Sequence, residues 1–236
     1  MYLTANNNPK LFFCSKEAIH SYDVKLDKLT SSIAHEELDY SMVSDFSVFG
    51  ETMNKATIVD YFGRFWFYNL DRAGEAISFK GSLPIKRNLE KFEDEQNVLC
   101  CGTPDAKLVL FAASSAKLNP TLRAYRVGQS GLARCMTYFP SKESVSRLVS
   151  LDCYFGKGGD PVIILSQKGL VRVVVLEEQD ASEAQVLTVS QAETVRWDMT
   201  YGSCNVTRVG DDYFYYDYDQ SGRFLVQVGV DVARTS

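Results

Sequence analysis

The chain has 236 residues, of which 45% are hydrophobic, so it contains enough apolar material for a substantial core and little for long disorder. Its formal net charge of -5 makes nucleic acid an unlikely main ligand, because phosphate binding normally needs a basic surface. No secretory signal and no membrane span can be read from the sequence, so we expect an intracellular protein, cytoplasmic or nuclear, whose six cysteines are buried thiols.

Five segments along the chain follow one pattern. Each has an apolar run of four or five residues, a short polar or glycine-containing turn, and a second strand in which apolar and polar residues alternate, which predicts a β-hairpin. In chain order the predicted hairpins span Leu11 to Leu26, Thr57 to Leu70, Leu108 to Val127, Val162 to Leu176 and Tyr213 to Val228. A recurring hairpin indicates a repeat architecture built from β-strands.

Three of the hairpins share a glycine in the turn, at Gly63, Gly169 and Gly222. A tight hairpin turn needs a positive φ at one position, and glycine adopts it without steric cost. The interval between the first two glycines is twice the interval between the last two, and the Leu108 hairpin lies in the longer one. The spacing therefore predicts one hairpin in every unit of about 50 residues.

Further strands flank several hairpins. We predict first strands over Ser41 to Phe49, Asn97 to Cys101, Ser146 to Phe155 and Val195 to Cys204. We predict fourth strands over Ala76 to Gly81, Ala133 to Phe139 and Gln185 to Val189. Four strands in each unit divide the chain into units of residues 1–38, 39–84, 97–139, 145–190 and 194–236, which we expect to form one domain over residues 1–236.

The fourth unit resembles a WD40 blade through its first three strands, Val145 to Phe155, Val162 to Ser166 and Gly169 to Glu177. Residues Tyr40 to Asp71 resemble another. The resemblance implies an all-β, WD40-like β-propeller, about five-bladed or incomplete. The chain has no Gly-His pair, and its Trp197-Asp198 pair lies in a predicted first strand, so the tetrad of hydrogen-bonded side chains of that family is not expected. Another all-β architecture, such as two small sandwiches or barrels, is the alternative.

Closure of the ring is incomplete in the sequence, which has no clear first strand before Leu11 and little after Val232 for a last outer strand. Residues Met1 to Thr4 could supply one of the two missing pieces but not both. The ring is therefore closed imperfectly, or a partner lends a strand, or the chain is part of a longer propeller. Exposed strand edges are normally covered or paired, so we predict protein partners, one of which completes an open blade.

The turn from Asp217 to Gly222 resembles the start of a calcium loop, with oxygen ligands at alternate positions and a glycine at the bend. Leu225 and Val228 stand where later acidic ligands would be needed, so we predict a hairpin turn and no metal site or cofactor. His20 and His35 lie in a strand and in a polar stretch without a nucleophile motif, so we predict no catalytic residue. A propeller-type hydrolase with a metal near the Asp217 loop is the alternative.

Two aromatic runs, Phe65 to Tyr68 and Tyr213 to Tyr218, place aromatic side chains on both faces of a strand. Burial between stacked blades explains such runs, and partial exposure as a binding surface is the alternative. We predict a non-catalytic protein–protein interaction scaffold, a subunit of a larger intracellular complex. Its candidate interaction residues are Trp66, Tyr68, Arg123, Tyr125, Tyr215 and Tyr218.

Overall fold

The structure is a computed structural model. It describes residues 2–3, 9–34, 38–51, 53–69, 77–83, 97–115, 118–128, 131–138, 148–155, 159–167, 170–179, 186–196, 205–209, 212–219 and 222–228. Side chains are described for most of these residues as far as Glu177. The described part contains no helix long and apolar enough to cross a membrane.

The described strands form five antiparallel sheets, in each of which the strands follow one another in chain order. The first sheet contains β1 (Tyr2–Leu3), β2 (Pro9–Cys14), β3 (Ile19–Asp23) and β4 (Lys28–Ile33). The second follows a single-turn 3₁₀ helix, η1 (Tyr40–Met42), and contains β5 (Val43–Phe49), β6 (Lys55–Asp60), β7 (Arg64–Asn69) and β8 (Ile77–Ser82). The third contains β9 (Asn97–Gly102), β10 (Leu108–Ser115), β11 (Leu118–Val127) and β12 (Leu132–Tyr138).

The fourth sheet contains β13 (Leu148–Phe155), β14 (Pro161–Gln167), β15 (Leu170–Gln179) and β16 (Val186–Arg196). The fifth contains three described strands, β17 (Asn205–Val209), β18 (Asp212–Asp219) and β19 (Gly222–Val228). Each of the five predicted hairpins is present, as the second and third strands of a sheet. The repeat that the sequence indicates is therefore confirmed at the level of the strands.

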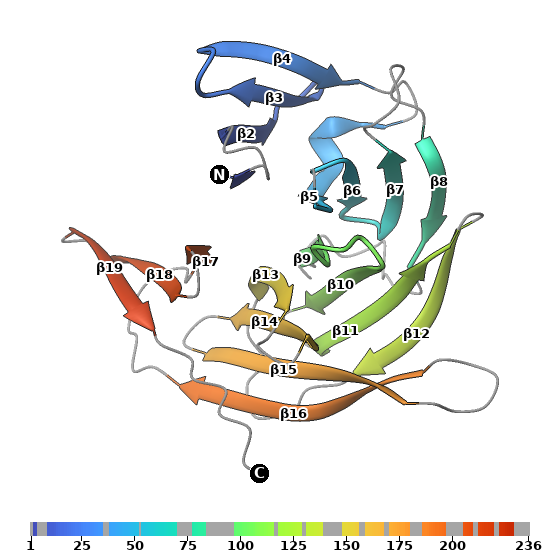
Figure 1. Ribbon diagram of the computed structural model, residues 1–236, viewed down its shortest axis with the longest axis vertical. Helices are drawn as coiled ribbons and strands as arrows, with labels where there is room; N and C mark the ends of the chain where they lie inside the picture. Colours follow the sequence, from blue (N-terminus) through green and yellow to red (C-terminus); the bar gives the residue numbers. More distant parts are fainter. Residues whose placement is uncertain are drawn as a thin grey trace.

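The sheets follow one another around a common centre in chain order (Figure 1). Strands β5, β9, β13 and β17 lie nearest the centre, and β8, β12, β16 and β19 lie on the outside. Contacts join β5 to β9, β9 to β13 and β13 to β17, so the inner strands form a continuous inner wall from the second sheet to the fifth. The first and fifth sheets stand at the two ends of this arc.

The predicted first strand over Val195 to Cys204 is wrong at its first two residues, and residues 197–204 lie outside the described part of the chain. Val195 and Arg196 end β16, where Arg196 pairs with Leu170 on the adjacent strand. The first strand of the fifth sheet is β17 instead. Strand β15 runs for ten residues, and its long backbone edge extends β16 beyond the local sequence signals that would end it. The Trp197-Asp198 pair and Gly169 lie outside the described residues.

Two strands of the first sheet are not predicted by the sequence. Strand β1 is only two residues long and pairs with β2 through Tyr2 and Leu3, so the amino-terminal segment completes its own sheet rather than the last one. Strand β4 is rich in polar residues and pairs with β3. Alternation of apolar and polar residues predicts a strand only where one face of the strand is buried. The edge strands β1 and β4 do not show this alternation.

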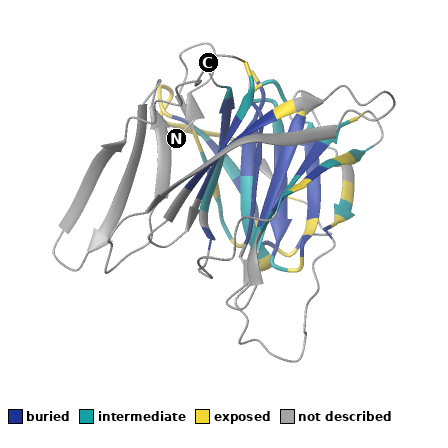
Figure 2. Ribbon diagram, turned by 90° about the horizontal axis from the view of Figure 1, so that it is seen from below, coloured by how far each residue is buried: buried dark blue, intermediate teal, exposed yellow. Residues whose placement is uncertain are grey.

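The core consists of three apolar clusters, each between consecutive sheets. Adjacent residues of a middle strand belong to different clusters: Ile58 packs toward the first sheet and its neighbour Val59 toward the third, and both are fully buried. This arrangement follows from the period of two residues in a strand, which sends successive side chains to opposite faces. Figure 2 shows the buried residues along the strands and the exposed ones concentrated at the turns.

The β6–β7 turn depends on a fully buried carboxylate, Asp60. Its Oδ1 accepts hydrogen bonds from the backbone N–H groups of Phe62 and Arg64, each at 2.8 Å, and its Oδ2 lies 2.6 Å from the Arg64 Nε. Gly63 occupies the turn with a φ of 76°, so the sequence-based argument for a turn glycine is confirmed there. The carboxylate thus satisfies the donors of the turn at a point where water is excluded.

Replacing Asp60 with alanine is expected to lower the free energy of unfolding by about 2 kcal/mol, because two backbone donors lose their acceptor. Urea denaturation measures this change. Asp60→Asn is the matched control, since it retains one side-chain oxygen and loses only the ion pair to the half-exposed Arg64, which contributes about 1 kcal/mol or less. Equal losses in the two variants would contradict the role of the accepted backbone hydrogen bonds.

The second and third sheets are also joined by hydrogen bonds from side chains of β5. The Ser44 Oγ accepts from the Val98 N–H at 3.1 Å, and the Asp45 Oδ2 accepts from the Cys100 N–H at 2.9 Å. Burial raises the pKa of Asp45 to about 7, although the hydrogen bond from Cys100 acts in the opposite direction. The ionisable carboxyl of Asp45 on β5 therefore joins the inner strand of the second sheet to β9, the inner strand of the third.

Candidate interaction site

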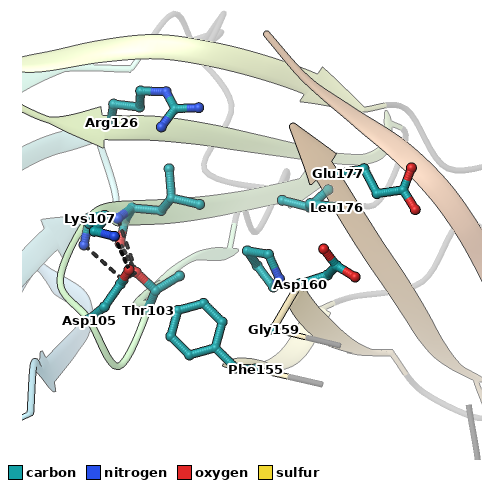
Figure 3. Close-up of a pocket in the computed structure, with 11 residues that line it drawn as sticks. Thr103, Asp105, Lys107, Arg126, Phe155, Gly159, Asp160, Leu176 and Glu177 are labelled. Atoms are coloured by element: carbon teal, nitrogen blue, oxygen red, sulfur yellow. Dashed lines mark hydrogen bonds and ion pairs between the residues drawn. The ribbon is translucent and has the colours of Figure 1, made fainter. Parts of the chain in front are cut away.

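A pocket of about 450 Å³ lies between the third and fourth sheets (Figure 3). The third sheet contributes the β9–β10 turn, the start of β10 and a residue of β11, whereas the fourth contributes the end of β13, the β13–β14 turn and part of β15. The lining residues are Thr103, Asp105, Lys107, Leu108, Arg126, Phe155, Gly159, Asp160, Pro161, Leu176 and Glu177. Sequence analysis did not single out this pocket, because residues of two repeats build it.

The β9–β10 turn is fixed by Thr103, which is fully buried. Its hydroxyl donates to the Asp105 Oδ1 at 2.6 Å and accepts from the Leu108 N–H at 3.0 Å. The other oxygen of Asp105 lies 3.4 Å from the Lys107 Nζ, and the Lys107 side chain is 77% exposed. The turn therefore holds an acidic group at the pocket wall and presents a cation to solvent.

Charge is unevenly distributed across the pocket. The third sheet contributes Lys107 and Arg126 together with Asp105, which pairs with Lys107. The fourth sheet contributes the acidic residues Asp160 and Glu177 (Figure 3). Phe155 and Leu176 supply apolar surface between them. Such a combination suits hydrogen bonds and ion pairs with a polar segment of another protein. The described lining residues include no histidine, serine or cysteine.

The predicted interaction residues divide into three groups. Trp66, Tyr68 and Tyr125 are buried: the first two belong to the cluster between the first and second sheets, and Tyr125 packs between the second and third. Every residue from Phe65 to Tyr68 is buried, which confirms for this run the interpretation that the aromatic residues pack between blades.

Of the remaining three candidates, one is partly exposed and two have side chains that the structure does not describe. Arg123 lies on β11 and is partly exposed. Tyr215 and Tyr218 lie on β18, where the structure describes the backbone and not the side chains. An interaction role therefore stays a prediction for Arg123, Tyr215 and Tyr218. Trp66, Tyr68 and Tyr125 could take part only indirectly, through the shape of the sheets they support.

Three cysteines line the contacts between inner strands and are buried: Cys100, Cys101 and Cys153. Burial raises the pKa of each thiol well above its ordinary value, so each remains protonated and weakly nucleophilic. All five cysteines that the structure describes are free thiols. Their state favours a packing role and not a catalytic one.

The Asp217 loop is the segment whose sequence resembles the start of a calcium loop. Asp217 and Asp219 end β18, and their side chains lie outside the described part of the structure. Among the described residues, no group of three or more histidine, cysteine, aspartate or glutamate side chains is arranged to hold a metal ion. The metal-dependent alternative therefore stays an untested prediction.

No known family model matches the sequence, and no curated protein matches it. Solved structures do match. The β-propeller domain of Myceliophteria thermophila Cps50 (Swd1) superposes with a TM-score of 0.59 and 9% identity over 96% of this chain and 72% of that one. The complex of the fission yeast SREBP-SCAP binding domains matches with a TM-score of 0.53 and 10% identity over 95% of this chain and 58% of the other.

The chain has a β-propeller fold. The predicted fold class, an all-β propeller that is about five-bladed or incomplete, is confirmed, and the five sheets are its blades. The Pseudomonas aeruginosa periplasmic gluconolactonase PpgL also matches, with a TM-score of 0.53 and 12% identity over 81% of this chain and 52% of that one. Since propellers include both enzymes and binding proteins, the fold alone does not decide the function.

Proposed function

We propose that this propeller is a non-catalytic interaction scaffold and an intracellular subunit of a larger complex. The observation that carries the proposal is the fifth blade, which has three described strands where each other blade has four. Strand β19 pairs with β18 alone among the described strands. A protein that adds an extended segment to the second edge of β19 would bind by strand addition, a known mode of peptide recognition. The mixed-charge pocket between the third and fourth blades offers a second contact for a polar segment.

The register of the β18–β19 hairpin indicates which backbone groups of β19 face away from β18, toward the edge that no described strand pairs with. Asp219 pairs with Gly222 across a two-residue loop, and Tyr216 pairs with Leu225. A two-residue loop normally closes on a hydrogen-bonded pair, after which hydrogen-bonded and non-hydrogen-bonded pairs alternate. The N–H groups of Arg223, Leu225 and Gln227 are therefore expected to point away from β18 and toward an added strand.

Replacing Leu225 with proline is expected to abolish recovery of the partner, because proline removes one donor from the free edge and leaves the hydrogen bonds to β18 in place. The tagged full-length chain is purified from its native cells, and the proteins recovered with it are identified by mass spectrometry and sized. The wild-type chain should carry a stoichiometric partner, and Leu225→Ala, the matched control, should retain it.

Thermal melting of each variant checks the fold, and Gln227→Pro serves as a second edge variant if Leu225→Pro melts early. A wild-type chain recovered as a lone monomer would overturn the scaffold proposal. Full retention of the partner by a folded proline variant would overturn the role of the β19 edge.

A further inference from the structure

The first blade exposes an apolar face at the opposite end of the arc from β19. Leu11 and Phe13 on β2 are 38% and 46% exposed, and Leu29 on β4 is 48% exposed. Their neighbours on β2, Phe12 and Cys14, face the other way and pack against the second blade. One side of this sheet is therefore part of the core, and the other is open.

The exposed side chains form one continuous surface. Leu11 pairs with Tyr22 across β2 and β3, Phe13 pairs with His20, and Tyr22 pairs with Leu29 across β3 and β4. Directly paired residues lie on the same face of a sheet. The ring centroids of Phe13 and His20 are 4.9 Å apart. The surface thus has an aliphatic and aromatic centre that spans three strands.

The equivalent positions in the next three blades are buried. In each of these blades the second strand carries two residues, separated by one, that face the preceding blade: Ala56 and Ile58 on β6, Val109 and Phe111 on β10, and Ile163 and Leu165 on β14. All six are at most 1% exposed. Leu11 and Phe13 occupy this position in the first blade. The surface therefore has the form of a contact face between blades, and no described sheet covers it.

The fifth blade does not fill this position, since the first and fifth blades stand apart at the ends of the arc (Figure 1). A ring of this fold thus has room for β-sheets between the fifth blade and the first.

We propose that the Leu11–Phe13–Leu29 face docks an antiparallel β-sheet supplied by a second polypeptide, in the position of the preceding blade. The covering sheet presents apolar residues from several strands, as Phe49, Val59 and Phe67 of the second blade do against the third. This proposal goes beyond the β19 edge because it places a contact at the other end of the arc and requires a folded sheet rather than a single strand.

The test replaces Phe13 with the photo-crosslinking residue p-benzoylphenylalanine in the full-length chain in its native cells. Irradiation is expected to link position 13 to one partner protein, at an apolar strand of an antiparallel sheet, as mapped by mass spectrometry. The same photo-crosslinking residue placed at Leu26 is the control, since Leu26 is 66% exposed in the β3–β4 turn and lies outside the Leu11–Phe13–Leu29 face. It should not produce this link.

Phe13→Lys provides the second measurement and is expected to reduce recovery of that partner at least tenfold, whereas Leu26→Lys retains it. Both variants should have the melting temperature of the wild-type chain, because each replaced side chain is substantially exposed. A crosslink to residues 205–228 of the same polypeptide, to a second copy of this chain or to a helical segment would overturn the proposal, as would no crosslink. If position 13 forms no crosslink while the wild-type chain still recovers the partner that binds the β19 edge, the docking proposal fails and the scaffold proposal does not.

Discussion

Replacing Phe111 with alanine is expected to lower the free energy of unfolding by about 3 to 5 kcal/mol. Phe111 is 1% exposed on β10 and belongs to the cluster between the second and third blades. Its ring lies 5.1 Å from that of Phe65 and 5.6 Å from that of Tyr125, measured between centroids. Truncation removes the ring contacts in both blades at once and leaves a cavity that two rigid sheets cannot close.

Urea denaturation monitored by tryptophan fluorescence measures the loss. Phe62→Ala is the matched control: Phe62 is 37% exposed in the β6–β7 turn, so its truncation should change stability by less than about 1 kcal/mol. A loss below about 1 kcal/mol for Phe111→Ala would show that the second and third blades do not depend on a shared core.

Raising the pH from 4 to 8 is expected to reduce the stability of the wild-type chain by about 2 to 4 kcal/mol through Asp45. Burial raises the pKa of this carboxyl from 3.8 to about 7 in the folded chain. The folded chain keeps the proton over a range where the unfolded chain has released it. The stabilising contribution is therefore complete below pH 3.8 and is lost as the pH rises to about 7.

Asp45→Asn should remove this pH dependence, because the amide does not titrate and still offers an oxygen to the Cys100 N–H. The variant is expected to be more stable than the wild-type chain at pH 8 and similar to it at pH 4. Ser44→Ala is the matched control, since it removes the neighbouring hydrogen bond to the Val98 N–H and leaves the carboxyl in place. If Asp45→Asn leaves the pH profile of stability unchanged, the titrating group lies elsewhere.

Strand pattern in the sequence was enough to predict the repeat and its five hairpins. Alternation in segments such as Thr57 to Leu70 reports directly on which side chains face a neighbouring blade, because burial fixes that pattern. Val195 and Arg196 were assigned to the wrong strand, since the end of β16 is determined by pairing with β15 and not by its own side chains. The edge strands β1 and β4 were not predicted either, because they too are defined by pairing with a neighbouring strand and not by a pattern in their own side chains.

The candidate site was less predictable. Trp66 and Tyr68 are residue types common at binding surfaces, yet both are buried because their face of β7 packs against the first sheet. The pocket combines Lys107 and Asp160, which are far apart in the sequence and meet only when the third and fourth blades pack. The exposure of Phe13 is likewise invisible in a segment that reads as an ordinary blade strand. Contacts between repeats are not encoded in the period of one repeat.

The arc has a consequence for how the molecule unfolds. Every sheet is built from consecutive strands, so almost all pairing is local in the sequence. A closed ring would give each blade two neighbours, whereas here the first and fifth blades stand at the ends. Such a linear array behaves like a chain of nearest-neighbour couplings, in which opening starts at the termini and moves inward. A protein that bridges the two ends would convert fraying of single blades into one cooperative transition.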